Sequence, residues 1–166
     1  MSKTDKKRIL VFPCGSEIGL EIHQSMQHST HFELIGASSL PDHGRFVYDN
    51  YIGDVPMHNH PDFPAAISQL VQQQRIDAIY PTMDSVAATL HGMAEQIDVR
   101  VIGSSAETSA ICQSKSKTYQ AVQHCVPVPT LYQSLDDVEH YPIFLKPDQG
   151  YGGRGTVRAN NRASAE

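Results

Sequence analysis

The sequence predicts an α/β fold in which a parallel sheet carries helices on both faces. Three observations lead to this prediction: short apolar runs alternate with amphipathic segments, the runs are continuous, and most of them end at glycine or proline. Continuous apolar runs are typical of strands buried on both faces of a sheet. Strands that alternate with helices at this spacing are joined by crossover connections, which make the sheet parallel.

The first unit of this pattern is a strand, a tight turn and a helix. Residues 8–13 form an apolar run that ends in proline, and a Cys-Gly-Ser turn follows. Apolar residues then recur every four positions at Ile18, Ile22 and Met26, a spacing typical of one helix face. We therefore expect a strand over 8–13 and a helix over 15–27.

Later segments repeat both signals. Further strands are expected over 31–37, 76–81 and 99–103, and further helices over 61–74 and 83–97. The stretch 40–61 is rich in Asp, His, Gly, Asn and Pro. It is therefore predicted to be a long surface connection with one short edge strand over 48–52.

The sequence changes character after Gly103. Two consecutive helical segments are expected over 104–112 and 114–124, without a strand between them. This break in the strand and helix alternation marks a boundary. We therefore predict two domains, 1–113 and 114–166.

The second domain is predicted to hold a β-hairpin. The prolines of 126–129 exclude helix, and an apolar run then ends at Lys146. A glycine-rich segment follows, and Thr156 begins a possible return strand. The glycines would then form the tip of the hairpin.

Composition and charge exclude several classes of protein. Apolar residues make up 40% of the 166 residues and charged residues 19%, which is typical of a globular chain. The net charge of −5 offers no basic surface for a nucleic acid. No apolar run approaches the ~20 residues that span a bilayer. Neither a nucleic-acid partner nor a membrane is therefore expected.

The cysteines indicate a reducing compartment. Cys14, Cys112 and Cys125 are odd in number, widely spaced and without a C-x-x-C pair. This pattern fits neither a disulfide framework nor a zinc knuckle. A cytoplasmic location is expected.

A lysine followed by a cluster of glycines is the sharpest chemical feature. Lys146 precedes four glycines that fall within the six residues 150–155. Glycine lets backbone N–H groups approach phosphate oxygens closely, and lysine supplies a compact positive charge. Because the lysine precedes the glycines, the segment is not a P-loop, and it is also not a G-x-G-x-x-G loop that opens a helix. The alternative is a hairpin tip that binds no ligand.

Two stretches resemble the ATP-grasp family. Residues 114–130 are similar to the family's lysine-bearing helix and the proline-containing segment after it. Residues 142–155 resemble its strand lysine and phosphate-covering loop, in a form close to that of biotin carboxylase. Residues 77–84 look like a strand end of carbamoyl-phosphate-synthase-like members. The resemblance implies a Rossmann-like pre-ATP-grasp domain followed by a partial α+β ATP-grasp subdomain.

By this resemblance, two lysines and the glycine loop would hold the phosphates of ATP. The implied set is Lys115, Lys146, Gly150, Tyr151, Gly152, Gly153, Arg154 and Gly155. Two ammonium groups and a row of backbone donors would neutralise a polyphosphate and stabilise charge during phosphoryl transfer. Arg154 could equally be an exposed residue that keeps the loop soluble. Lys117 is the local rival of Lys115 and is interpreted as part of a solvated face.

The resemblance also implies a reaction. Family members are carboxylate–amine or carboxylate–thiol ligases that transfer the γ-phosphate of ATP to a small carboxylate and then join the acyl phosphate to a nucleophile. Their adenine contacts and Mg²⁺ ligands lie beyond the part that matches up to Glu166. We therefore expect no metal site in this chain, an incomplete active site and little ATP turnover by the chain alone. No catalytic residue is identified, and a homodimer is left open.

The alternative from another class is a non-catalytic Rossmann-like module that binds a ligand or a partner. Two further residues are compatible with either function. Glu17 and Asp84 both follow predicted strand ends, where ligands bind in open parallel sheets. Either could face a substrate, or both could simply be carboxylates that favour a helix N-terminus. His58 and His60 lie two residues apart without a third ligand, which does not define a metal site.

Overall fold

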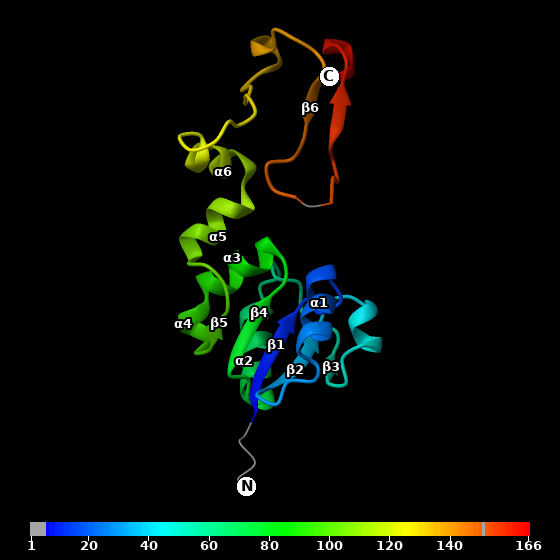
Figure 1. The fold of residues 1–166 in the computed structure, drawn as a ribbon, viewed down its shortest axis with the longest axis vertical. Coiled ribbons are helices and arrows are strands. Elements are labelled where there is room, and N and C mark those ends of the chain that lie inside the picture. Colours follow the sequence, from blue (N-terminus) through cyan, green and yellow to red (C-terminus); the bar gives the residue numbers. More distant parts are fainter. Residues whose placement is uncertain (1–5, 151) are drawn as a thin grey trace. The chain divides into compact units, whose positions relative to one another are not determined.

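The computed structural model describes residues 6–150 and 152–166, and Figure 1 shows its fold. The chain divides into two compact units, Met1–Ser109 and Ala110–Glu166. The division falls within helix α5 (Ala106–Gln113), a few residues before the domain boundary expected at Ser114.

The first unit contains the parallel sheet that the sequence predicts. Its strands are β1 (Lys7–Phe12), β2 (Phe32–Ala37), β3 (Tyr51–Ile52), β4 (Ala78–Pro81) and β5 (Arg100–Val101). The strand order is β3-β2-β1-β4-β5, and every neighbouring pair is parallel. The expected α/β class is confirmed, and the short edge strand expected over 48–52 is β3.

Helices connect these strands. They are α1 (Glu17–Met26), α2 (Phe63–Gln74), α3 (Asp84–Gly92) and α4 (Ala94–Ile97), with a short 3₁₀ turn η1 (His43–Phe46) in the long connection before β3. The single helix expected over 83–97 is divided at Met93, whose backbone leaves the helical region while its side chain stays buried. Among the described residues, no helix is long and apolar enough to cross a lipid bilayer.

Strand β1 is buried on both sides, as its continuous apolar run predicts. Leu10 and Phe12 enter a core cluster that includes side chains of α2, α3 and α4. Val11 belongs to a smaller cluster on the other face, where Ile22 of α1 packs. Figure 1 shows β1 at the centre of this sheet. The sheet is therefore covered by helices on both faces, and its carboxyl edge remains for the turns into α1 and α3.

The second unit is built around helix α6 and a hairpin. Its elements are α6 (Lys115–Val122), the 3₁₀ turn η2 (Leu135–Asp137), β6 (Ile143–Leu145), β7 (Val157–Ala159) and the 3₁₀ turn η3 (Arg162–Ser164). Strands β6 and β7 pair antiparallel, with Phe144 opposite Arg158. The predicted hairpin is thus confirmed, and residues 146–156 form its loop.

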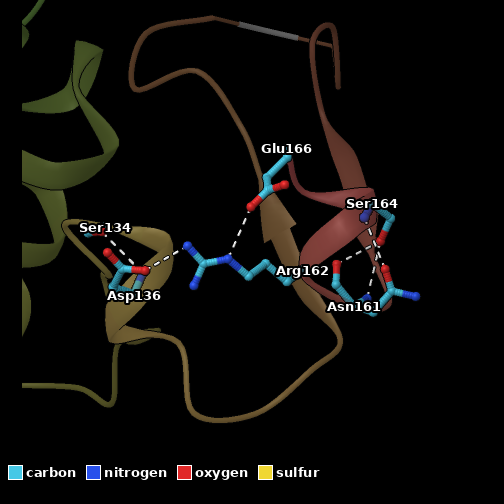
Figure 2. Close-up of polar contacts among 6 residues, drawn as sticks. All are labelled: Ser134, Asp136, Asn161, Arg162, Ser164 and Glu166. Atoms are coloured by element: carbon cyan, nitrogen blue, oxygen red, sulfur yellow. Dashed lines mark hydrogen bonds and ion pairs between the residues drawn. The ribbon is translucent and has the colours of Figure 1, made fainter.

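Polar contacts join the turn after β7 to the segment before β6. Arg162 lies 2.6 Å from the carboxylate of Asp136 in η2 and 3.0 Å from that of Glu166. Asn161 caps η3 by accepting a hydrogen bond from the N–H of Ser164 (Figure 2). Because these groups are exposed, each ion pair contributes little stability. Their effect is to set the position of η3 against η2.

Candidate functional site

Lys115 is the first residue of α6, and the helix begins there because Ser114 caps it. The hydroxyl of Ser114 accepts a hydrogen bond from the N–H of Lys117 at 3.2 Å, and its side chain is buried. Serine is among the preferred N-cap residues because its oxygen satisfies a helix N–H that lacks a partner. Lys115 itself is half-buried, whereas Lys117 is exposed.

Lys146 directly follows strand β6 and reaches back to the same helix. Its ammonium donates a hydrogen bond to the hydroxyl of Tyr119 at 2.8 Å and lies 5.4 Å from the centre of that ring. Tyr119 comes four residues after Lys115, so both side chains lie on one face of α6. Both lysines predicted to bind phosphate therefore lie at α6: Lys115 begins the helix, and Lys146 contacts Tyr119 within it.

Asp148 ties the start of the loop to the start of α6. Its carboxylate accepts hydrogen bonds from the hydroxyl of Ser114 at 2.6 Å and from the N–H of Ser116 at 2.7 Å. Its backbone carbonyl accepts from the N–H and from the ammonium of Lys115, both at 3.1 Å. The ammonium of Lys115 also donates to the carbonyl of Gly150 at 3.3 Å.

The glycines of the loop adopt backbone conformations that favour glycine. The φ angles are 151° at Gly150, 62° at Gly152, 69° at Gly153 and 70° at Gly155. A side chain at Gly152 would meet no atom within 4 Å. The left-handed backbone, and not close packing, therefore explains glycine at this position. Arg154 is exposed between these glycines, and Tyr151, which the sequence also assigned to the site, lies outside the described residues.

Open space borders this arrangement. A hollow of about 720 Å³ is lined by Lys146 and Tyr119, by β6 and by the extended segment 129–135. Of the residues that the sequence assigns to the phosphates, Lys146 lines this hollow. An ammonium group beside open space is a suitable environment for an anion.

Curated proteins match the chain in sequence, among them the following two. The carbamoyl phosphate synthase large chain of Methanothermobacter thermautotrophicus is 30% identical over 113 residues, which are 60% of this chain and 11% of that protein. The D-alanine–D-alanine ligase of Fusobacterium nucleatum is 32% identical over 65 residues, which are 39% of this chain and 23% of that protein. The chain is a homologue of the ATP-grasp enzymes.

Solved structures agree on the fold of this ATP-grasp homologue. Biotin carboxylase from Campylobacter jejuni superposes with a TM-score of 0.66 at 23% identity, over 96% of this chain and 39% of that protein. No family model matches the chain. The chain spans only 11% and 23% of these two curated relatives.

The other two candidate residues of the ATP-grasp homologue lie in the first unit. Glu17 and Asp84 are the first residues of α1 and α3, and both are exposed. They follow the adjacent strands β1 and β4. The hydroxyls of Ser16 and Thr82 join these two turns with a hydrogen bond of 2.8 Å. Both carboxylates thus occupy the carboxyl edge of the sheet, where their position also suits the helix N-termini.

Sequence reasoning missed the residues that hold the lysines in place. Asp148 and Tyr119 received no role, although each contacts one of the two candidate lysines. Serine before a helix is a known N-cap signal, so the cap formed by Ser114 could have been predicted. Asp148, the carboxylate beside the lysine and glycine cluster, could then have been proposed as a partner of that helix N-terminus.

Metal-binding residues do not gather in the part of the chain that the structure describes. No group of three or more His, Cys, Asp or Glu side chains there could hold a metal ion. His58 lies 3.2 Å from the hydroxyl of Thr89, and His60 lies 3.6 Å from the carboxylate of Asp62. The N–H of Asp62 also donates a hydrogen bond to the ring of His60 at 3.2 Å.

Proposed function

We propose that Lys115, Lys146 and the glycine loop 150–155 bind the phosphates of ATP within an ATP-dependent ligase of the carboxylate–amine or carboxylate–thiol type. The observation that carries this proposal is that the ammonium of Lys115 contacts the base of the glycine loop, while that of Lys146 contacts Tyr119 on the same helix. The ATP-grasp relatives support it, because one is a ligase by name and the other a synthase. Glycine at the left-handed loop positions leaves the backbone free to cover the phosphates.

The proposed reaction has two steps. The carboxylate of a small substrate attacks the γ-phosphorus of ATP, the bond to the bridging oxygen breaks, and ADP leaves with that electron pair. The nitrogen or sulfur of a nucleophile then attacks the acyl phosphate, and inorganic phosphate leaves. Both lysine ammonium groups would offset the charge that builds up on the phosphate oxygens in the first step. Arg154 would add a third cation from the loop.

Magnesium accompanies ATP in this family, but the described residues do not form a site for it. The carboxylate nearest the loop, Asp148, already accepts hydrogen bonds from Ser114 and Ser116. No group of three metal-ligating side chains exists among the described residues.

We further propose that the first unit is the pre-ATP-grasp domain and the second belongs to the ATP-grasp domain. Glu17 and Asp84 would face the carboxylate substrate or a neighbouring part of the protein from the carboxyl edge of the sheet. A cytoplasmic location is supported by three free thiols, those of Cys14, Cys112 and Cys125. A homodimer remains one assembly compatible with this arrangement.

An ATP titration followed by amide NMR tests the phosphate site. We expect ATP to shift the amide signals of residues 114–119 and 146–156, and adenosine, which lacks phosphate, to leave them in place. Lys115→Ala and Lys146→Ala should each weaken ATP binding about tenfold or more, the loss typical of a charge-assisted hydrogen bond.

Lys117→Ala is the matched control for these variants. It removes the same charge from the same helix two residues along, at an exposed position, and should leave the affinity nearly unchanged. If Lys117→Ala weakens binding as much as Lys115→Ala does, ATP is attracted by the overall charge of the helix, and a specific phosphate site is excluded. If ATP and adenosine produce the same shifts, phosphate recognition is excluded.

A further inference from the structure

Asp148 places a negative charge inside a site proposed for an anion. This carboxylate is exposed and belongs to the loop, not to α6. Both of its oxygens are used, one by the hydroxyl of Ser114 at 2.6 Å and one by the N–H of Ser116 at 2.7 Å. A carboxylate would repel phosphate unless its charge were already engaged, so these contacts need an explanation.

These contacts place the negative charge of Asp148 at the N-terminus of α6. The N-terminus of a helix carries partial positive charge and N–H groups without helical partners. Asp148 fills this position from outside the helix, and its own backbone carbonyl takes the N–H of Lys115 at 3.1 Å. A phosphate group therefore finds the helix terminus occupied, so in this proposal it meets side-chain cations: the two lysines, and Arg154 of the loop.

The same residue determines where the ammonium of Lys115 lies. That ammonium donates to the carbonyl of Asp148 at 3.1 Å and to the carbonyl of Gly150 at 3.3 Å. Both acceptors are backbone atoms at the beginning of the loop, so their position depends on how the loop is attached. The carboxylate of Asp148 supplies two of the hydrogen bonds that attach it.

We propose that Asp148 is a positioning residue of the nucleotide site, which anchors the base of the glycine loop to the start of α6 and so holds Lys115 beside the phosphates. Asp148 itself touches no phosphate in this proposal. It acts through Lys115, while Lys146 is held separately by Tyr119. This proposal rests on the proposed function, because it assigns Asp148 a role in binding ATP.

A double-mutant cycle on the whole chain tests the coupling. Asp148→Ala should weaken ATP binding about tenfold, comparable to the loss of one charge-assisted hydrogen bond. In that background Lys115→Ala should add little further loss, whereas Lys146→Ala should keep its full effect. Asp148→Asn, which retains one acceptor oxygen, should give an intermediate loss and serves if the alanine variant unfolds.

A second readout needs no nucleotide. The ammonium protons of Lys115 should exchange with water more slowly than those of Lys117 in the free protein, and Asp148→Ala should remove the difference. Asp137→Ala is the control, because it deletes a second exposed carboxylate of the same unit, one that accepts from the N–H of Ser134 at 3.0 Å. We expect it to change neither the exchange of Lys115 nor ATP binding.

The outcomes separate the two proposals. If ATP binds and the losses from Asp148→Ala and Lys115→Ala simply add, the phosphate site stands and the positioning role of Asp148 is wrong. Unchanged exchange of Lys115 in Asp148→Ala leads to the same conclusion. If the wild-type chain shows no phosphate-dependent response to ATP, the proposed function fails and the role of Asp148 fails with it.

Discussion

At the scale of single residues, the neighbours of Asp148 stabilise the charged form of its carboxylate. The hydroxyl of Ser114 and the N–H of Ser116 keep the pKa of this carboxyl below its usual value, and Lys115 adds a smaller attraction. A lowered pKa means that the contacts stabilise the folded chain above the usual pKa, and that this stabilisation is lost as the pH falls through the folded value.

The lowered pKa can be checked by following the NMR chemical shift of the Asp148 carboxyl carbon as a function of pH. Its midpoint should fall below the ~3.9 of a free aspartate. In Ser114→Ala the midpoint should rise toward that value, because the largest cause of the shift is removed. A midpoint that does not move in Ser114→Ala would mean that the hydrogen bond to Ser114 is not formed in solution.

Cys14 lies in the first unit at the end of β1, and its thiol is fully buried. Its pKa is raised to about 11, chiefly by burial; Asp42 adds to the rise, whereas the contact of 3.3 Å with the hydroxyl of Ser38 lowers the pKa. At neutral pH this thiol is therefore protonated, which makes it a poor nucleophile.

Alkylation with iodoacetamide at pH 8 distinguishes the three cysteines. Cys112 and Cys125 are exposed and should be labelled in the folded chain, while Cys14 should react only after unfolding. Peptide mass analysis of samples taken over time gives the three rates. Labelling of Cys14 as fast as that of Cys112 would show that the end of β1 opens readily.

The residue scale also shows what the sequence could reveal about the site. Lys146 and the glycines could be found because residue type and spacing alone carry that signal. The role of Asp148 could not, because it depends on a contact with Ser114, which is 34 residues away along the chain. The contact of Lys146 with Tyr119 spans 27 residues and was missed for the same reason.

At the scale of elements, the strands and helices of the first unit followed from local pattern. The five expected strand segments all contain strands, because continuous apolar runs are a local property. The break between α3 and α4 was not predicted, since Met93 continues the apolar pattern and only its backbone, with φ −115° and ψ 9°, departs from the helix. The order of strands in the sheet likewise depends on packing between distant segments.

The glycine loop offers a prediction at this scale. Gly152 has a φ of 62° and open space around it. An alanine side chain there would meet no neighbour, so the only cost is the free energy of holding alanine in the left-handed conformation. That cost is about 1–2 kcal/mol, which corresponds to a loss of ATP affinity of roughly fivefold to thirtyfold if alanine lets the free loop relax and ATP binding restores this conformation. The ATP titration of Gly152→Ala measures it.

Gly92→Ala is the control for the loop variant. Gly92 ends helix α3 and also has open space around it, but without a left-handed backbone. Alanine there should leave ATP binding unchanged and can stabilise the helix by up to about 1 kcal/mol. Wild-type ATP affinity in Gly152→Ala would mean that the loop binds nucleotide in another backbone conformation.

At the scale of the whole molecule, the two units differ in how much they bury. Among the described residues, every buried hydrophobic side chain except Ala159 belongs to the first unit. Both units expose some large apolar side chains, and in the second unit these are Val126, Leu131, Tyr132, Phe144 and Val157. Since apolar burial is the main source of folding free energy, the second unit should be the less stable of the two.

Urea unfolding followed by amide NMR should therefore show two transitions. The amides of α6, β6 and β7 should lose their native signals at lower urea than those of β1 and β4, so a single two-state fit should fail. ATP should shift only the first of these transitions, by about 2.7 kcal/mol at a hundredfold excess over its dissociation constant. Adenosine should shift neither. Coincident transitions in all amides would show that the second unit draws its stability from the first, and a shift of β1 with ATP would place the nucleotide on the sheet instead of the glycine loop.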